Sequence, residues 1–311
     1  MTNISADEFF PACSYRSTSI NCLRGTKKGL SALGDLVVDS FYKFEQFYNE
    51  FQPAGVEKAF EYQLWTQENA DKWSRRYPES KSLEQNEFLN QSVQGMDYFV
   101  QNEAYLIDPY TLEKWYRNRY NNIKYETGLV KEISQDKTVV CDLWEKQFDY
   151  IFICTNYATS MLAKGFSQQF DYYLDHCKPV AGSYLEIPLE GCDFSFDHSF
   201  SLALDKYHFI YRQAQQVLQI GSSTDNRCDI HLANEQKLQE IYQFVASALQ
   251  VQLPPFESFK SIAGVRHKGH KRMPFWGEIS QGIYSVCGLY KNAYTFAYQA
   301  ANELGRSLGK T

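Results

Sequence analysis

The greatest concentration of side chains that could bind a ligand is the basic run Arg266-His267-Lys268-Gly269-His270-Lys271-Arg272. A guanidinium group matches a carboxylate with two parallel hydrogen bonds, and a lysine ammonium binds phosphate as a point charge. The run therefore has three interpretations: an anion site for a carboxylate or phosphate substrate, a nucleic-acid-binding patch, or a solvated loop. His267 and His270 could chelate a metal ion, but no cysteine or carboxylate stands nearby, so no metal site is expected.

A second basic stretch comprises Arg16, Arg24, Lys27 and Lys28. The sequence has no G-x-S-x-G motif, which argues against a serine hydrolase. Its cysteines form no C-x-x-C pair and no zinc spacing, so buried, reduced thiols are expected. These cysteines are Cys13, Cys22, Cys141, Cys154, Cys177, Cys192, Cys228 and Cys287.

The composition limits the class of protein. The 311 residues are 44% hydrophobic and carry a formal net charge of −6, so a sizeable core is expected and nucleic acid is not an expected partner. The sequence contains no run of about 18 apolar residues, so no membrane-spanning helix is predicted. The residues after Met1 show no basic segment followed by an apolar core, which predicts a cytoplasmic protein without a signal peptide.

Two helix starts can be read from the residues around them. Apolar residues recur at helical spacing over 35–51, which predicts an amphipathic helix capped by Ser31 or Asp35. Asp108 is a suitable cap for a second helix, and Pro109 is suited to its first position.

Extended segments dominate the rest of the chain. Residues 150–154 are continuously apolar, as in a strand buried on both faces. The stretch 178–221 predicts a mostly antiparallel sheet, with strands at 184–187, 199–204, 209–213 and 217–220. Further strands are expected at 60–65, 105–107, 123–133, 137–143, 260–265 and 283–286, and further helices at 66–77, 233–250 and 292–308.

Four segments, in this order, resemble the D-amino-acid-oxidase-like (DAO) family of FAD-dependent oxidoreductases. The first is the strand and Asp-Pro helix start at 105–109, and the second comprises 128–133 and 148–156. For the second segment, the resemblance implies that Val130 lies beside the adenine and that the strand end lies against the cofactor. The strand-end residues are Cys154, Thr155 and Asn156, and Asn156 stands where the family usually has glycine.

The third and fourth segments imply the substrate and flavin contacts. In segment 262–277 the resemblance assigns Arg266 to the substrate carboxylate and Gly264 to the cofactor, and His267 replaces the usual proline. Segment 284–297 resembles a loop and helix start that direct backbone N–H groups at the flavin ring. The cofactor contacts implied there are Gly288, Lys291, Asn292, Ala293, Tyr294 and Thr295.

The G-x-G-x-x-G unit of the family is absent from this sequence. In the family that unit holds the pyrophosphate and ribose of FAD, and we expect that roughly the first 40–50 residues of a family member are missing here. Three explanations stay open: a partner chain supplies the unit, the true start lies upstream, or the protein has lost FAD.

The expected architecture is α/β. It combines an incomplete FAD-binding Rossmann-like domain of the glutathione-reductase type with a mostly antiparallel, β-rich substrate domain. The first domain is expected at 1–60, 105–170 and 260–311, and the second at 61–104 and 171–259.

The expected activity is FAD-dependent oxidation of the C–N bond of a small-molecule amine or amino acid by hydride transfer to flavin. Tyr184, Tyr211 or Tyr290 is expected to close the substrate pocket, and no residue can be assigned as a catalytic acid or base. The alternative is a cofactor-less ligand-binding or interaction protein that descends from the same family.

Overall fold

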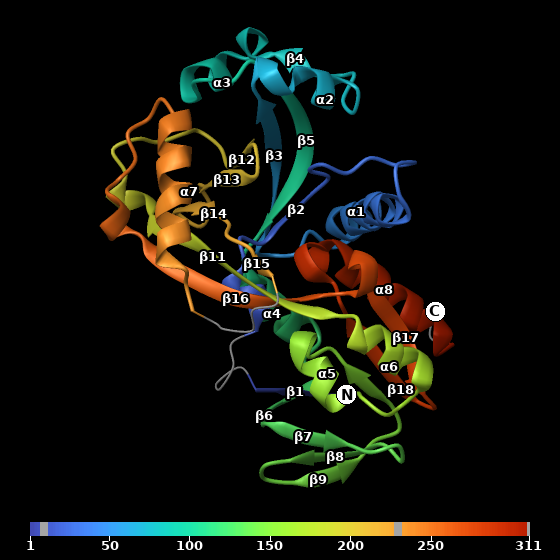
Figure 1. The fold of residues 1–311 in the computed structure, drawn as a ribbon. Coiled ribbons are helices and arrows are strands. Elements are labelled where there is room, and N and C mark those ends of the chain that lie inside the picture. Colours follow the sequence, from blue (N-terminus) through green and yellow to red (C-terminus); the bar gives the residue numbers. More distant parts are fainter. Residues whose placement is uncertain (7–11, 227–231, 310–311) are drawn as a thin grey trace.

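A computed structural model describes residues 1–6, 12–226 and 232–309, which form an α/β protein with mixed sheets (Figure 1). The helices are α1 Ala32–Phe51, α2 Ala70–Ser74, α3 Glu87–Ser92, α4 Pro109–Arg119, α5 Thr159–Leu162, α6 Gln168–Asp175, α7 Glu235–Ala248 and α8 Ala293–Ser307. Short 3-10 turns used below are η1 Cys13–Arg16, η2 Gln67–Asn69, η4 Asn156–Ala158, η7 His270–Arg272 and η8 Tyr290–Asn292.

The strands are β1 Thr2–Ser5, β2 Ile20–Cys22, β3 Val56–Trp65, β4 Lys81–Ser82, β5 Tyr98–Ile107, β6 Lys124–Thr127, β7 Val130–Ile133, β8 Thr138–Cys141, β9 Glu145–Gln147, β10 Ile151–Ile153, β11 Lys178–Pro188, β12 Phe200–Leu204, β13 Tyr207–Arg212, β14 Val217–Gly221, β15 Asp225–Asn226, β16 Lys260–Lys268, β17 Phe275–Ser280 and β18 Ile283–Cys287.

The two predicted helix starts are confirmed. The Ser31 hydroxyl accepts a hydrogen bond from the Gly34 amide at 3.0 Å, and α1 therefore begins at Ala32 rather than at residue 35. The Asp108 carboxylate accepts a hydrogen bond from the amide of Tyr110 at 3.1 Å, and the proline after it opens α4.

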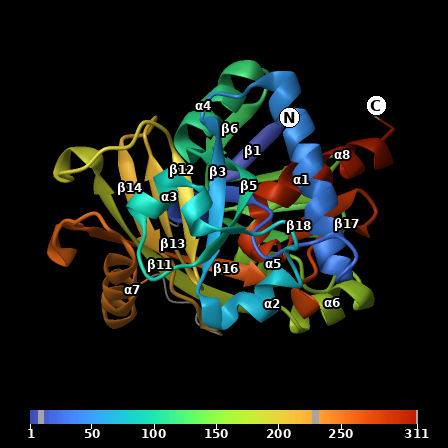
Figure 2. The same ribbon diagram turned by 90° about the horizontal axis from the view of Figure 1, so that it is seen from above.

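The large sheet follows the strand order β15-β11-β14-β13-β12-β3-β5-β2, with β16 paired to β11 and β4 paired to β5. The pairs β11–β14, β14–β13 and β13–β12 are antiparallel, as predicted for 178–221. The pair β12–β3 is parallel, so the sheet is mixed. Helix α7 packs against this sheet, and α1 and α8 lie on the opposite side of the molecule (Figure 2).

Three small sheets complete the described fold: β1–β6, β10–β18–β17 and β7–β8–β9. Ile4 of β1 and Val130 of β7 pack on the hydrophobic cluster that contains Ile153 of β10. Between described residues, β10 pairs only with β18, and Phe152 is 41% exposed, stacked on Tyr284 at 5.1 Å. The prediction that 150–154 is buried on both faces is therefore wrong, because an apolar run does not specify how many strands flank it.

Short elements differ most from the sequence predictions. The helix expected over 66–77 is divided into η2 and α2. Helix α6 and strand β17 were not predicted; α6 has only 8 residues and buries Phe170 and Leu174, which is too little for a helical period to be recognised.

The described cysteines are free, with Cys141 and Cys287 buried and Cys154 exposed, and Cys228 lies outside the described residues. Within the described part of the chain, no helix is both long enough and apolar enough to cross a membrane.

Candidate functional site

One row of residues across the large sheet carries polar side chains into the interior. Gln63 pairs with Ala203, Ala203 with His208, His208 with Gly221, and Gly221 with Tyr184. Directly paired residues point to the same face of a sheet, so Gln63, His208 and Tyr184 lie on one face, and all three are buried. A Cβ at Gly221 would lie 2.7 Å from Tyr184 Cβ and 3.3 Å from His208 Nε2. A larger residue there would displace its neighbours in the row.

The loop after β2 covers this row. Arg24 Nη1 lies 3.5 Å from His208 Nδ1, and Arg24 Nη2 donates a hydrogen bond to the Asp205 carbonyl at 3.0 Å. The Gly25 amide donates to Gln63 Oε1 at 3.3 Å. The row is therefore enclosed between the sheet and a basic loop.

Burial and charge set the protonation states beneath this loop. Burial, followed by the charge of Arg24, lowers the pKa of His208 well below its usual value, so the imidazole is neutral. Glu61 is 1% exposed, and burial raises its carboxyl pKa even though Arg24 opposes the shift. Among the described residues, neither Glu61 Oε2 nor His208 Nε2 has a hydrogen-bond partner. Both atoms are buried, so each lacks the hydrogen-bond partner that a buried polar atom usually has.

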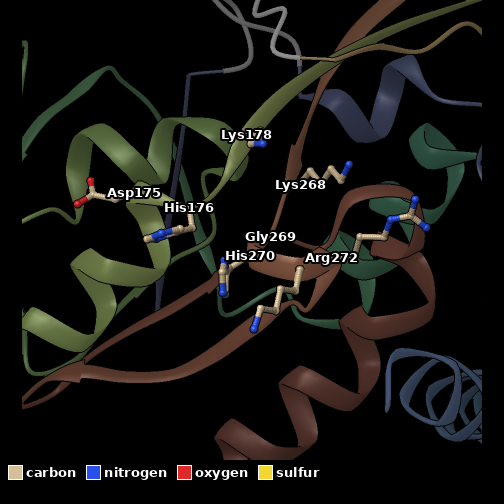
Figure 3. Close-up of a pocket in the computed structure, with 8 residues that line it drawn as sticks. Asp175, His176, Lys178, Lys268, Gly269, His270 and Arg272 are labelled. Carbon is tan, nitrogen blue, oxygen red and sulfur yellow. The ribbon is translucent and has the colours of Figure 1, made fainter. Parts of the chain in front are cut away.

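The side chains of the basic run 266–272 lie in different environments, because successive residues of a strand point to opposite faces. The cationic groups of Arg266 and Lys268 lie 5.9 and 5.7 Å from the centre of the Tyr290 ring. His267, between them in sequence, is fully buried, with its ring 5.9 Å from that of Tyr157. Burial lowers the pKa of His267 to about 4. Lys268 and the η7 residues that follow it line a pocket with the end of α6 (Figure 3).

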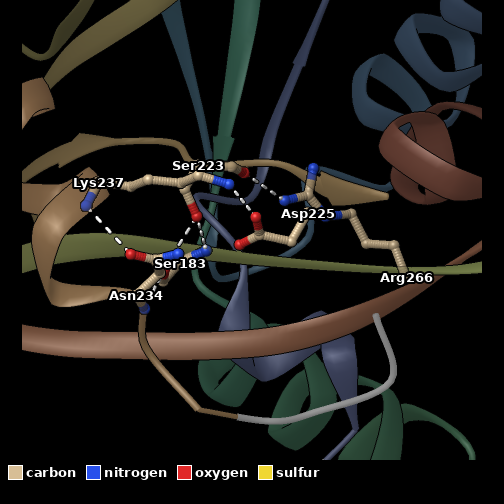
Figure 4. Close-up of polar contacts among 6 residues, drawn as sticks. All are labelled: Ser183, Ser223, Asp225, Asn234, Lys237 and Arg266. Atoms are coloured by element: carbon tan, nitrogen blue, oxygen red, sulfur yellow. Dashed lines mark hydrogen bonds and ion pairs between the residues drawn. The ribbon is translucent and has the colours of Figure 1, made fainter. Parts of the chain in front are cut away.

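The Arg266 guanidinium has room and free donors. Its Nη2 donates a hydrogen bond to the Ser223 carbonyl at 3.1 Å, and the Ser223 and Ser183 hydroxyls lie 2.9 Å apart (Figure 4). A Cβ at Gly182 would lie 1.6 Å from Nη2, so only glycine leaves space for the guanidinium. Within residues 1–6, 12–226 and 232–309, the guanidinium makes no further hydrogen bond, which leaves N–H groups for a carboxylate.

Lys291, beside Tyr290, lies in the most cationic part of the site. Desolvation, together with the charges of Arg266, Arg24, Arg272 and Lys268, lowers the pKa of the Lys291 ammonium to about 8. Four cations from three segments of the chain thus act on one amine. Such an arrangement favours an anionic or electron-rich ligand.

The start of α8 is joined to η1 and β2. The Tyr294 hydroxyl donates to the Ser14 carbonyl at 3.1 Å, and the Thr295 hydroxyl donates to Asn21 Oδ1 at 2.6 Å. The side chain of Asn292, at the helix N-cap, makes no capping bond. Uncapped amides, the adjoining Ala293 and the Lys291 ammonium suit the electronegative edge of a flavin ring.

Gly264, Gly288 and Asn156, which were predicted to contact the cofactor, lie close to the backbone of neighbouring segments. A Cβ at Gly264 would lie 3.2 Å from Arg16 Cβ, so η1 packs directly on β16. Gly288 has φ +70° and brings the backbone close to Gly269. Asn156, at φ 53°, donates from Nδ2 to the Val265 carbonyl at 2.9 Å and accepts from the His267 amide at 3.1 Å. The asparagine therefore ties the end of β10 to β16.

The structure does not bring all the predicted residues together. Cys154 and Thr155 are exposed at the end of β10, and Val130 lies on the separate sheet β7–β8–β9. Tyr211 packs in the apolar cluster under α7, with its ring 5.0 Å from that of Phe196, whereas Tyr184 faces the polar row. A Tyr211 hydroxyl on the α7 side cannot close a pocket on the other face.

Sequence reasoning missed His208, Glu61 and Gln63. The signal was present: each is a polar residue inside a strand whose neighbouring residues are apolar. Buried polar residues of this kind are uncommon unless they are paired or functional.

FAD fits one end of this site better than the other. The start of α8, the orphan Asn21 Nδ2 and the Lys291 ammonium offer donors for a flavin ring. For the pyrophosphate, the family's usual cradle is the G-x-G-x-x-G turn, which the sequence lacks.

Comparison with known proteins identifies the family. The model of the family described as FAD dependent oxidoreductase (DAO) matches residues 4–306. A search of curated proteins finds no significant match.

Solved structures resemble the chain over nearly its whole length. Glycine oxidase from Bacillus cereus ATCC 14579 is 11% identical with a TM-score of 0.78, covering 100% of this chain and 90% of its own. Glycine oxidase from Geobacillus kaustophilus is 13% identical with a TM-score of 0.78, covering 100% of this chain and 88% of its own. L-α-glycerophosphate oxidase from Mycoplasma pneumoniae, solved with FAD bound, is 11% identical with a TM-score of 0.77, covering 99% and 88%. At these identities the likeness shows the fold.

Proposed function

The chain belongs to the FAD-dependent oxidoreductase family, and we propose that it oxidises the C–N bond of a small amine or amino acid. FAD is the cofactor of the family, and when bound it accepts a hydride from the carbon that bears the nitrogen. The observation that carries the proposal is the Arg266 guanidinium, with free donors, in the same cationic group as Lys291 at the start of α8. The glycine oxidases of similar fold act on an amino acid, as their name states.

The residues of the site act by binding and orientation. Arg266 binds the substrate carboxylate with two N–H groups, while Tyr184 and Tyr290 close the pocket. Burial raises the pKa of Tyr184, so its hydroxyl stays protonated and can donate. The surrounding cations lower the pKa of a bound amine, and the neutral amine is the form that can lose a hydride.

We further propose that a segment outside the described residues holds the FAD phosphates, supplied by a partner chain or by the same polypeptide. This is supported by the open edges of β1 and β10: each pairs on one side only within the described chain. Unpaired strand edges accept a further strand. In this arrangement, residues 1–60, 105–170 and 260–311 form the cofactor side, and 61–104 and 171–259 form the substrate side.

The test begins with the flavin. Purified protein is mixed with FAD, and the visible flavin absorption is followed during anaerobic addition of amino acids and of amines that lack a carboxylate. Bleaching by an amino acid or amine supports the oxidase. Protein that binds no FAD, alone or with its co-purifying partners, would favour the cofactor-less alternative.

Arg266→Ala then tests the anchor. Loss of two charge-assisted hydrogen bonds is expected to raise KM for carboxylate substrates by roughly 100-fold, with KM unchanged for amines without a carboxylate. Arg306→Ala, which removes an exposed arginine at the far end of α8, is the matched control. An equal loss for both substrate classes would refute the role of Arg266.

A further inference from the structure

A pocket of about 520 Å³ lies outside the polar row, between the end of α6, the start of β11 and the η7 turn (Figure 3). Six of the residues that line it are basic: His176, Lys178, Lys268, His270, Lys271 and Arg272. The pocket has the volume of an ordinary small-molecule site.

The positive charge of this pocket is not compensated. Across the described residues, none of the six basic side chains has an ion-pair partner, although some ion pairs form elsewhere on the surface. Asp175 also lines the pocket, but its carboxylate pairs with Lys164 at 2.9 Å. Four of the six are lysine or arginine, so a monocarboxylate would leave most of their positive charge unbalanced.

The turn that carries the basic residues is held in an unusual conformation. Lys271 and Arg272 have φ values of 51° and 67°, in the left-handed region that residues other than glycine seldom adopt. The Tyr173 hydroxyl donates to the Met273 carbonyl at 2.9 Å, and a Cβ at Gly269 would lie 2.0 Å from that carbonyl oxygen. Backbone strain retained by surrounding contacts is typical of binding sites.

Two imidazoles on the wall of the pocket are in edge-to-face contact with each other. The His176 and His270 rings are 4.8 Å apart, and the Tyr172 carbonyl holds His176 Nδ1 at 2.7 Å. Desolvation, followed by the charges of His176 and Lys271, lowers the pKa of His270, so this imidazole adds little positive charge unless an anion lies beside it.

We propose that this pocket binds the diphosphate group of a small molecule. Lysine and arginine side chains are the usual phosphate ligands, and a diphosphate carries enough negative charge to balance several of them. Because the FAD phosphates are proposed to lie on a segment outside the described residues, this pocket is assigned to the diphosphate of a separate small molecule.

The test measures inorganic pyrophosphate binding to the full chain by titration calorimetry. The Lys178→Gln/His270→Gln variant is expected to bind pyrophosphate at least roughly tenfold more weakly, because charge-assisted contacts are lost. Lys260→Gln, which removes one positive charge at the exposed far end of β16, is the control and should bind as the wild type does. Lys178→Gln alone, with its thermal unfolding compared to the wild type, separates lost binding from lost folding.

The source is distinguished by repeating the titration with FAD present at saturation. Undiminished pyrophosphate binding supports a separate ligand, and competition by FAD would overturn the proposal. The proposal is overturned if wild-type protein binds pyrophosphate no more tightly than acetate, or if Lys260→Gln weakens binding as much as the pocket variant. Tighter binding of RNA than of pyrophosphate that persists in the pocket variant would also overturn it.

Discussion

Two faces of the same strands in the large sheet differ in almost every physical respect. The row Gln63–Ala203–His208–Gly221–Tyr184 carries polar side chains beneath a basic loop. The row one residue along each strand, Tyr62–Leu202–Phe209–Ile220–Leu185, is apolar and packs in the cluster under α7. Because side chains alternate between faces, one set of strands supplies both the main core and the candidate site.

The largest effect should come from the apolar face. Phe209 is fully buried, and Phe209→Ala is expected to cost about 3–5 kcal/mol of unfolding free energy, since it leaves a cavity. His208→Ala, one residue away on the polar face, should cost much less, because His208 Nε2 has no partner in the described structure. Denaturant unfolding measures both. Equal losses would break the distinction between the faces.

A smaller effect of opposite sign is expected at Glu61. Its raised pKa means that the folded state favours the protonated carboxyl, so wild-type protein loses stability as the pH rises through the folded pKa. Glu61→Gln removes that cost and should be about 1 kcal/mol more stable at pH 8, the scale of an unsatisfied buried polar group.

The difference at Glu61 should shrink as the pH falls toward 4, where the wild-type carboxyl is protonated. Urea unfolding at the two pH values tests this, with Glu84→Gln, an exposed carboxylate in the same region, as the control. A less stable Glu61→Gln protein at pH 8 would show that the carboxylate is ionised and well paired.

The sequence predicted the elements better than it predicted their faces. The helical spacing of α1 and the Asp108 cap are local signals, and both were confirmed. Tyr184 and Tyr211 were given the same role, but they lie on opposite faces, because the role of a tyrosine depends on strand register and on what covers each face. Register is set by contacts between distant segments, which a single sequence does not display.

The same reason explains the missed polar residues. Glu61 and Gln63 alternate within an apolar strand, and their significance comes from Arg24 and Gly25, which approach from a loop before α1. In contrast, Arg266 and the start of α8 were predicted from motifs. Their roles stay predictions, and the structure shows only that the charge of Arg266 acts on Lys291, beside that helix start.

At Lys291 the expected effect is on the chemical reactivity of the amine, and the effect on stability is expected to be the smallest. With its pKa lowered to about 8, roughly half of the amine is neutral at pH 8, against well under 1% for an ordinary lysine. Only the neutral amine reacts with acylating reagents, so Lys291 should be labelled at least several-fold faster than Lys260, an exposed lysine for which no charge cluster is found. Peptide mass spectrometry after brief acetic anhydride treatment measures both rates, and the rate at Lys291 should level off above a midpoint near pH 8.

Arg266→Gln removes the neighbouring charge that lowers the Lys291 pKa most, so it should raise that pKa and slow labelling of Lys291 at pH 8 while leaving the labelling of Lys260 unchanged. A labelling midpoint for Lys291 near that of ordinary lysines would mean that the cations of β16, η7 and the loop after β2 do not converge on Lys291. The proposal that this site binds an anionic substrate would then lose its support.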